Sequence, residues 1–170
     1  IVMRLAIIGT LAAMLTATAV APAWAQVNAD ESFVVVGYMR SYGCSLNAAQ
    51  VDLFLPDMKL DVPTYQKVLD DLVERGFAIG DSQNLDGGVV LKPAFCGVEK
   101  GNDPRLSLIE IMRYNGCRLT QADPPKHLMP VGFMPDSFRP LVQELITAGD
   151  LAPEGSDLVL SAALCAGPNA

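Results

Sequence analysis

The residues of this chain best suited to chemistry are four cysteines, Cys44, Cys96, Cys117 and Cys165. Thiolates can ligate zinc, exchange disulfides with other proteins or form structural cross-links. The sequence contains no Cys-x-x-Cys pair and only one histidine, so it has neither clustered zinc ligands nor a redox motif. Structural disulfides are therefore the favoured interpretation, and four cysteines allow three pairings.

His127 is the only histidine, so a Ser-His-Asp or Cys-His mechanism would depend entirely on it. Its place near the end of an expected short helix indicates a surface or rim residue rather than a catalytic one. The sequence also lacks the G-x-S-x-G, Walker and G-x-G-x-x-G motifs. We therefore predict no catalytic residue, no cofactor-binding residue and no bound metal.

Two groups of acidic residues have the composition of a cation site. Asp70 and Glu74 are four residues apart in an expected helix, so their carboxylates share one face. A solvated helix face is the simpler interpretation of this pair. Asp81, Asn84 and Asp86 lie in an expected hairpin tip, but their spacing does not match a calcium loop. Turn formation explains these three residues better.

The first 25 residues predict export. Arg4 is their only charge, an apolar run follows, and Ala23-Trp24-Ala25 supplies small residues to a cleavage site. We predict a signal peptide over 1–25, cut between Ala25 and Gln26, with an uncleaved anchor as the alternative. No later stretch has the roughly 20 apolar residues of a membrane span. The mature protein is therefore expected to be periplasmic or secreted, where disulfides form.

Charge narrows the choice of partner. The whole chain has 12 Lys and Arg against 19 Asp and Glu, a formal net charge of −7. Removal of residues 1–25 takes away Arg4 alone among the charged residues, which leaves 11 against 19 and a net charge of −8. Nucleic acids and anionic membrane surfaces attract basic proteins. We therefore predict neither a nucleic acid nor an anionic membrane surface as a partner. The apolar pattern separately predicts no membrane span once the signal peptide is removed.

The mature chain contains one sequence unit twice. Residues 38–44 match residues 111–117 at an offset of 73, and the offset falls to 69 at the second cysteine of each copy. Arg40 and Arg113 occupy the same position, and we expect each to pair with a carboxylate or with the linker. Recurrence at a fixed spacing indicates duplicated structural units. We predict repeat one over 26–97, a linker over 98–104, repeat two over 105–166 and a tail over 167–170.

The duplication selects one disulfide pairing. Equivalent cysteines then form equivalent bonds, Cys44–Cys96 and Cys117–Cys165. Each bond would join the end of the first helix to the chain just after the hairpin. A repeat of about 60 residues buries little apolar surface by itself. A bond that closes a loop of about 50 residues adds about 4 kcal/mol in the chain-entropy account.

Both copies contain residues typical of helix starts. In the first copy, capping boxes are expected for Asn28 with Glu31 and for Asn47 with Gln50. In the second copy, Asp103-Pro104 supplies an N-cap and a first-turn proline, and Thr120 with Asp123 resembles a capping box.

The pattern of each copy predicts three helices followed by a two-stranded hairpin. The first helix ends at the Gly-Cys step, where glycine suits a left-handed residue. A short second helix stops near Pro56 and Pro130. The third has apolar residues at helical spacing up to Gly76 and Gly149, and its second copy is expected to start within 136–137. Short apolar runs then form the hairpin, so the chain is predicted to be mainly α with small β-hairpins, an α+β fold.

This order of elements resembles the winged helix-turn-helix fold. The resemblance covers nearly all of both copies, and it rests on the element order, the hairpin and the steps from Leu72 to Phe77 and from Leu145 to Leu151. It implies two tandem winged-helix-like repeats, each of three helices and a two-stranded wing. DNA-binding members carry basic side chains on the third helix. Neither copy has a net basic face there, which disfavours DNA binding.

The arrangement also resembles uncharacterised exported proteins of alphaproteobacteria that repeat a Gly-Cys…Leu/Met-Pro…Leu-x-x-x-Gly…Cys pattern. That resemblance implies no particular activity. We predict an exported, disulfide-stabilised, non-catalytic protein that serves as a protein-binding or structural module of the periplasm, with a protein partner in the cell envelope. An accessory subunit of an envelope or membrane complex and an enzyme of unrecognised class are the alternatives.

Overall fold

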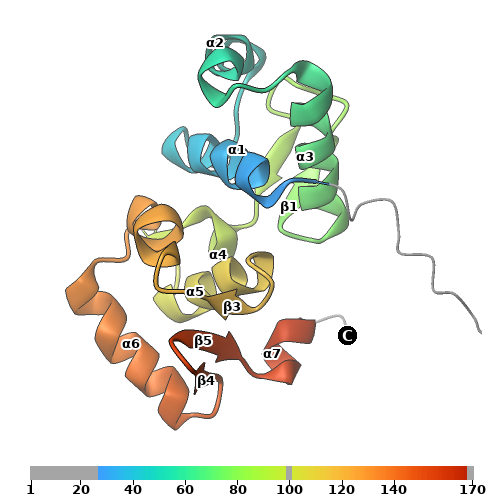
Figure 1. Cartoon of the computed structure of the whole chain (residues 1–170). Helices are drawn as coiled ribbons and strands as arrows, with labels where there is room; N and C mark the ends of the chain where they lie inside the picture. Colours follow the sequence, from blue (N-terminus) through green and yellow to red (C-terminus); the bar gives the residue numbers. More distant parts are fainter. Residues whose placement is uncertain (1–26, 99–100, 168–170) are drawn as a thin grey trace, which may run out of the picture.

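The computed structural model describes residues 27–98 and 101–167 (Figure 1). The expected signal peptide 1–25 and its cleavage site between Ala25 and Gln26 lie outside this part of the chain. The described chain is an α+β fold in which helices predominate and two small antiparallel sheets are present. None of the helices in it is long and apolar enough to cross a membrane.

The first half of the chain runs from α1 to α4. Asn28 begins α1 by accepting a hydrogen bond from the amide of Asp30, and not through the box with Glu31 that the sequence favours. Asn47 and Gln50 form the predicted capping box at the start of the next helix. The elements are α1 (Ala29–Ser41), α2 (Ala48–Met58), α3 (Val62–Glu74), β1 (Ala78–Gly80), β2 (Val89–Leu91) and α4 (Pro93–Cys96).

Two features of this half differ from the prediction. The second helix was expected to stop near Pro56, whereas α2 continues to Met58. Pro56 removes one amide donor there, and Lys59 ends the helix in a left-handed conformation with φ of 57°. The sequence also gave no indication of α4, a single turn that carries Cys96.

The second half runs from α5 to α7. Asp103 caps α5 and Pro104 occupies its first turn, as predicted. The third predicted helix of this copy, α6, begins at Pro135, one residue before the predicted start within 136–137. The elements are α5 (Pro104–Tyr114), β3 (Arg118–Leu119), η3 (Pro124–Leu128), η4 (Met129–Val131), α6 (Pro135–Thr147), β4 (Leu151–Glu154), β5 (Asp157–Leu160) and α7 (Ala162–Ala166).

The second helical segment of this half is not the expected α-helix. Residues 124–131 form a π-helical turn followed by a 3₁₀ turn. The carboxylate of Asp123 accepts from the amide of Thr120 at 2.5 Å, which is one bond of the predicted capping box. Three prolines in the segment lack amide donors, so a regular hydrogen-bond ladder cannot follow that start.

Both halves contain the predicted antiparallel hairpin. Ala78 lies opposite Leu91 in the β1–β2 pair, and Leu151 lies opposite Leu160 in the β4–β5 pair. In the second half, β3 joins the free side of β5, which gives the strand order β3-β5-β4. The prediction missed β3 because two residues are too few to show an alternating pattern.

Both predicted disulfides are confirmed. Cys44 bonds Cys96 and Cys117 bonds Cys165, with Cα atoms 5.6 and 5.5 Å apart. Cys44 and Cys117 have φ values of 75° and 65°, and the glycine before each is also left-handed. The amide of each donates to the carbonyl oxygen five residues earlier, at 2.6 and 2.7 Å. The two bonds therefore begin from the same sharp turn at the end of a helix.

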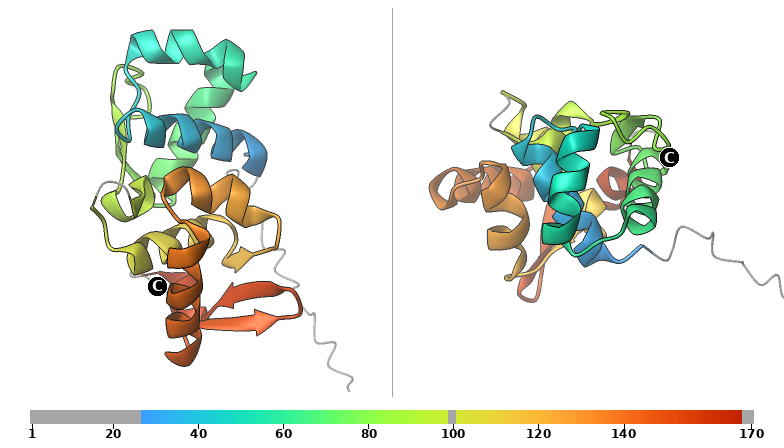
Figure 2. Two further views of the ribbon diagram at one scale, coloured as in Figure 1. Left: turned by 90° about the vertical axis from the view of Figure 1, so that its left-hand side faces the viewer. Right: turned by 90° about the horizontal axis from the view of Figure 1, so that it is seen from above.

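An aromatic cluster joins the two halves. The ring centroids of Phe77, Phe95 and Tyr114 are 5.0 Å apart in each of the three pairs. Buried apolar side chains of both halves belong to one continuous core. Figures 1 and 2 show the second half below the first, with α1 facing the η3–η4 segment. The shared core therefore fixes the distance between these two segments.

Candidate functional site

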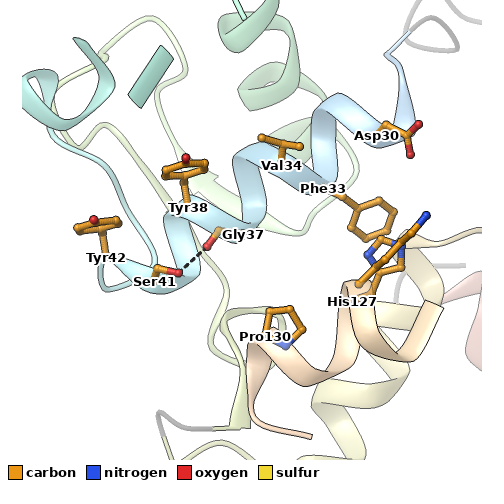
Figure 3. A pocket seen from close by; sticks show the side chains of 10 residues that line it. Asp30, Phe33, Val34, Gly37, Tyr38, Ser41, Tyr42, His127 and Pro130 are labelled. Atoms are coloured by element: carbon orange, nitrogen blue, oxygen red, sulfur yellow. Dashed lines mark hydrogen bonds between the residues drawn. The ribbon is translucent and has the colours of Figure 1, made fainter. Parts of the chain in front are cut away.

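A groove of about 790 Å³ opens between α1 and the η3–η4 segment (Figure 3). Most of its lining is apolar or aromatic, and its two formally charged residues lie where α1 begins and in η3. An apolar cleft with a few polar groups is the usual form of a ligand-binding site. The residues that line the groove are Asp30, Phe33, Val34, Gly37, Tyr38, Ser41, Tyr42, Lys126, His127 and Pro130.

The α1 wall of the groove presents residues at helical spacing. Val34, Tyr38 and Tyr42 follow one another at four-residue intervals, so their side chains form a ridge along the helix. The rings of Tyr38 and Tyr42 lie against Phe54 of α2, with centroids 5.0 and 4.6 Å away. Phe54 thus supports the ridge from behind.

Gly37 lines the groove on α1 and contributes no side chain to it. Apart from the adjacent residues and the nearby helix backbone, a Cβ atom added there would meet nothing of the described chain within 4 Å. Glycine inside a helix is destabilising by about 0.5–1 kcal/mol relative to alanine. Neither backbone conformation nor crowding within the chain requires glycine at this position. The absence of a side chain leaves the α1 backbone open to the groove.

His127 forms part of the opposite wall, which corrects the expected surface or rim position. Its side chain is only 10 % exposed, and its ring stacks on Phe33 with centroids 3.6 Å apart. Nε2 lies 3.7 Å from a carboxylate oxygen of Asp123, and the buried Nδ1 has no hydrogen-bond partner. Burial lowers the pKa of His127, against the opposing effect of the Asp123 charge, so the imidazole is neutral at pH 7.

Arg40 follows Gly37 by three residues and lies on the face of α1 that meets α4. It is 8 % exposed, and its Nε donates to the carbonyl oxygen of Phe95 at 2.8 Å. Its guanidinium carbon lies 4.4 Å from the centroid of the Phe95 ring. Burial lowers the pKa of Arg40 to about 9, so the group keeps its positive charge at neutral pH. The expected carboxylate partner is missing, because no ion pair among the described residues involves Arg40.

Arg113 shows a different arrangement at the equivalent position of α5. Its Nη1 lies 2.6 Å from a carboxylate oxygen of Glu110, which confirms the expected carboxylate partner for this arginine. Glu110 stands 73 residues after Gly37, at the same offset that relates Arg113 to Arg40. The second half therefore supplies, from its own helix, the carboxylate that the first half lacks.

Tyr114 connects the groove to the aromatic cluster. Its ring meets the edge of Phe33 with centroids 5.2 Å apart and receives the guanidinium of Arg75 on its face at 4.7 Å. Burial raises the pKa of Tyr114 to about 12, so its hydroxyl stays protonated. His127 stacks on Phe33, and Phe33 makes an edge-to-face contact with Tyr114, so the groove wall is in contact with the core of the second half.

The acidic residues considered as cation ligands in the sequence lie outside the groove lining, and several of them form hydrogen bonds within the first half. Glu74 is exposed, as the solvated-face interpretation expects, whereas Asp70 is half-buried and accepts a hydrogen bond from the hydroxyl of Ser82. Asp71, between them in the sequence, is 5 % exposed and pairs with Arg75 at 3.2 Å. In the first hairpin tip the predicted turn formation is confirmed, since the side chains of Asp81 and Asn84 accept from amides two residues further on. No group of three or more potential metal ligands occurs in residues 27–98 and 101–167.

The groove is suited to holding a ligand more than to transferring a proton. In the described chain, neither ring nitrogen of His127 is hydrogen-bonded to a serine or cysteine. Two features of the sequence indicate the α1 wall. Val34, Tyr38 and Tyr42 recur at four-residue intervals, and position 37 is glycine where the equivalent position 110 is glutamate. The second wall gives no such signal, because it depends on how the halves pack.

The chain was also compared with known proteins. Family models, curated proteins and solved structures all gave no match to it, so its function has to be argued from the groove and the residues around it.

Proposed function

We propose that this chain is an exported, non-catalytic binding protein whose groove holds a segment of a protein partner in the cell envelope. The apolar groove between α1 and η3–η4 is the observation that carries the proposal. Two of its apolar side chains are left open to solvent, with Val34 40 % and Tyr42 47 % exposed. Contiguous exposed apolar surface in a folded protein usually marks an interaction site.

The two halves are, in this proposal, tandem winged-helix-like repeats of an exported protein family. Each has three helical segments followed by an antiparallel hairpin and a short helix that carries the second cysteine. Each also has a left-handed cysteine after its first helix and a disulfide from that cysteine to the short helix. The third helix of the first half carries Asp71 and Arg75 as an ion pair, which does not present a basic surface to DNA.

The contacts between the halves support a groove that exists before the partner binds. Phe33 of α1 is held between His127 and Tyr114 of the second half, with ring centroids 3.6 and 5.2 Å away. The α1 wall and the η3–η4 wall of the groove are therefore in direct contact through these aromatic rings. A preformed groove avoids part of the conformational entropy that binding would otherwise remove.

A second candidate function is that of an accessory subunit in an envelope complex, and the β1–β2 hairpin favours it. Ile79 and Val90 face each other across this hairpin and are 58 % and 40 % exposed. An exposed pair of aliphatic side chains on a sheet is a further apolar contact surface. This surface is separate from the groove lining.

Site-specific photo-cross-linking in cells that export the protein tests both candidates. A photoreactive phenylalanine analogue replaces Tyr42 in the groove, Ile79 on the hairpin, or Leu106 as a control that is 53 % exposed on α5. We expect a discrete adduct from position 42, identified by mass spectrometry, and none from position 106. Gly37→Leu fills the groove from the open side of α1 and should remove the adduct while the protein stays folded.

The outcomes separate the two functions. Equal adducts from positions 42 and 106, or an adduct at 42 that persists with Gly37→Leu, would contradict partner binding in the groove. A discrete adduct from position 79 alone would favour the accessory subunit.

A further inference from the structure

Arg40 is a buried cation for which the described chain provides no anion. Its Nε has a carbonyl acceptor, but Nη2 is buried without any hydrogen-bond partner. A buried charge is destabilising unless it is paired or fully hydrogen-bonded, so proteins seldom retain one without a function. The aromatic face of Phe95 compensates only one side of the guanidinium.

In the second half the equivalent arginine, Arg113, has a carboxylate partner, although its Nε is buried without a hydrogen-bond partner among the described residues. Glu110 precedes Arg113 by three residues, and residues three apart lie next to each other on a helix. Gly37 precedes Arg40 by the same three residues and lines the groove. Apart from the adjacent residues and the nearby backbone of α1 itself, no atom of the described chain lies within 4 Å of the position that a Cβ at residue 37 would take. A group that enters the groove over Gly37 would therefore occupy the place that the Glu110 side chain takes in the other half.

We propose that the partner segment carries a glutamate or aspartate side chain that enters the groove over Gly37 and pairs with Arg40. The inference rests on the proposed function, and it adds the chemistry that the groove recognises. Lys126 in the groove lining supports it, because a cation favours a negatively charged ligand. Asp30, the other formally charged residue of the lining, lies in the first turn of α1, seven residues before Gly37. The rings of Phe33 and Tyr38, which lie near Gly37, favour apolar residues on either side of the acidic residue in the partner segment.

The length of the groove favours a peptide segment over a smaller molecule. The α1 wall extends from Asp30 to Tyr42, and twelve helical rises of about 1.5 Å give roughly 18 Å. An extended peptide advances about 3.3 Å per residue, so roughly five residues fit along the wall. The acidic residue would lie near the middle, since Gly37 is near the middle of this stretch.

The first arm of the test needs no ligand. Gly37→Glu and Gly37→Gln both remove the glycine from the helix and differ only in charge. If Arg40 accepts a carboxylate over position 37, the Gly37→Glu protein should have a Tm about 4 °C above that of Gly37→Gln at pH 7. The difference should disappear at pH 3, where the new carboxyl is protonated. Equal Tm values at pH 7 would overturn the inference.

The second arm measures binding to the wild-type protein by calorimetry. The probes are three peptides: acetyl-Leu-Phe-Glu-Leu-Phe-amide, the same peptide with Gln for Glu, and the Gln peptide with a free C-terminal carboxylate. We expect the Glu peptide to bind at least tenfold more tightly than the Gln peptide, with a shifted Arg40 Nε–H resonance in NMR spectra. Gly37→Glu should remove that advantage, because its own carboxylate competes for Arg40.

Each result has a defined meaning. Equal affinity of the Glu and Gln peptides, or no binding of either, would overturn the acidic side chain as the recognised group. Tighter binding of the peptide with the free C-terminal carboxylate would assign the anion to a chain terminus instead and would also overturn it. None of these results affects the cross-links at positions 42 and 106, which test the partner-binding function separately.

Discussion

Helices α1 and α5 each carry an arginine four residues before a left-handed, disulfide-bonded cysteine, Arg40 before Cys44 and Arg113 before Cys117. In α5 the arginine is paired within the helix to Glu110 at 2.6 Å. In α1 the corresponding position is glycine, and the arginine is buried without a carboxylate. The two helices have their arginine and cysteine at equivalent positions and differ at the residue three before the arginine, which in α1 lines the groove. Among the described residues, the carboxylate–arginine pair of α5 therefore has no counterpart in α1.

The segments after these helices differ as well. In the first half α2 is a regular helix, and its Phe54 supports Tyr38 and Tyr42 from behind. In the second half the proline-rich η3–η4 segment is irregular and faces α1, with His127 against Phe33. One segment thus stiffens a wall of the groove and the other forms the opposite wall. In the proposed function, the binding surface is formed by the parts in which the two halves differ.

Removal of each disulfide should give the largest effect and tests how alike the halves are in stability. The bonds close loops of 52 and 48 residues, so the chain-entropy account predicts a loss of about 4 kcal/mol for either. We expect Cys44→Ala/Cys96→Ala to lose more than Cys117→Ala/Cys165→Ala. Cys44 and Cys96 are both buried, whereas Cys165 is half-buried, so the first pair also leaves a cavity.

Urea unfolding of the two double variants and the wild type measures the difference. Peptide mapping of the oxidised wild-type protein serves as the control and should show only the two bonds. An equal or larger loss in the Cys117→Ala/Cys165→Ala protein would mean that burial does not distinguish the halves.

Replacement of the two arginines by methionine sharpens the contrast between α1 and α5. Arg113→Met leaves Glu110 without its cation, and we expect a loss of about 2 kcal/mol. Arg40→Met removes a buried charge that has no carboxylate partner, and methionine preserves contact with Phe95. We therefore expect Arg40→Met to lose clearly less, about 1 kcal/mol or under. Denaturant midpoints compare them, and a larger loss for Arg40→Met would show that the chain itself satisfies this arginine.

The regular parts of the fold were predictable because local rules set them. The Asn47–Gln50 capping box and the Asp103-Pro104 start require only residues that are neighbours in the sequence. The disulfide pairing was predictable because the expected duplication leaves one of the three possible pairings. The η3–η4 segment was not predictable, since Asp123 favours the start of a helix, the three prolines disfavour its continuation, and the sequence pattern does not show which effect prevails.

The candidate site could be predicted on one side only. The ridge of Val34, Tyr38 and Tyr42 and the glycine at position 37 are visible in the sequence. The burial of Arg40 and the stacking of Phe33 on His127 follow from contacts between segments about 50 to 90 residues apart. No periodic pattern reports such contacts. The expected rim position of His127 was wrong for this reason.

The smallest expected effect concerns His127, for which the first half has no counterpart. Burial lowers the pKa of this imidazole in the folded protein below 6.5, with Asp123 and Asp30 opposing the shift and Lys126 and Arg40 adding to it. As pH falls through 6.5 the unfolded chain binds a proton before the folded chain does. This contribution to stability is therefore present above pH 6.5 and declines below it. His127→Phe keeps a ring on Phe33 without a titrating group, so its loss of stability between pH 7 and 5.5, measured by urea unfolding, should be smaller than that of the wild type. Equal slopes would mean that His127 titrates alike in both states, and the groove wall would then be open to water rather than closed by the packing of the two halves.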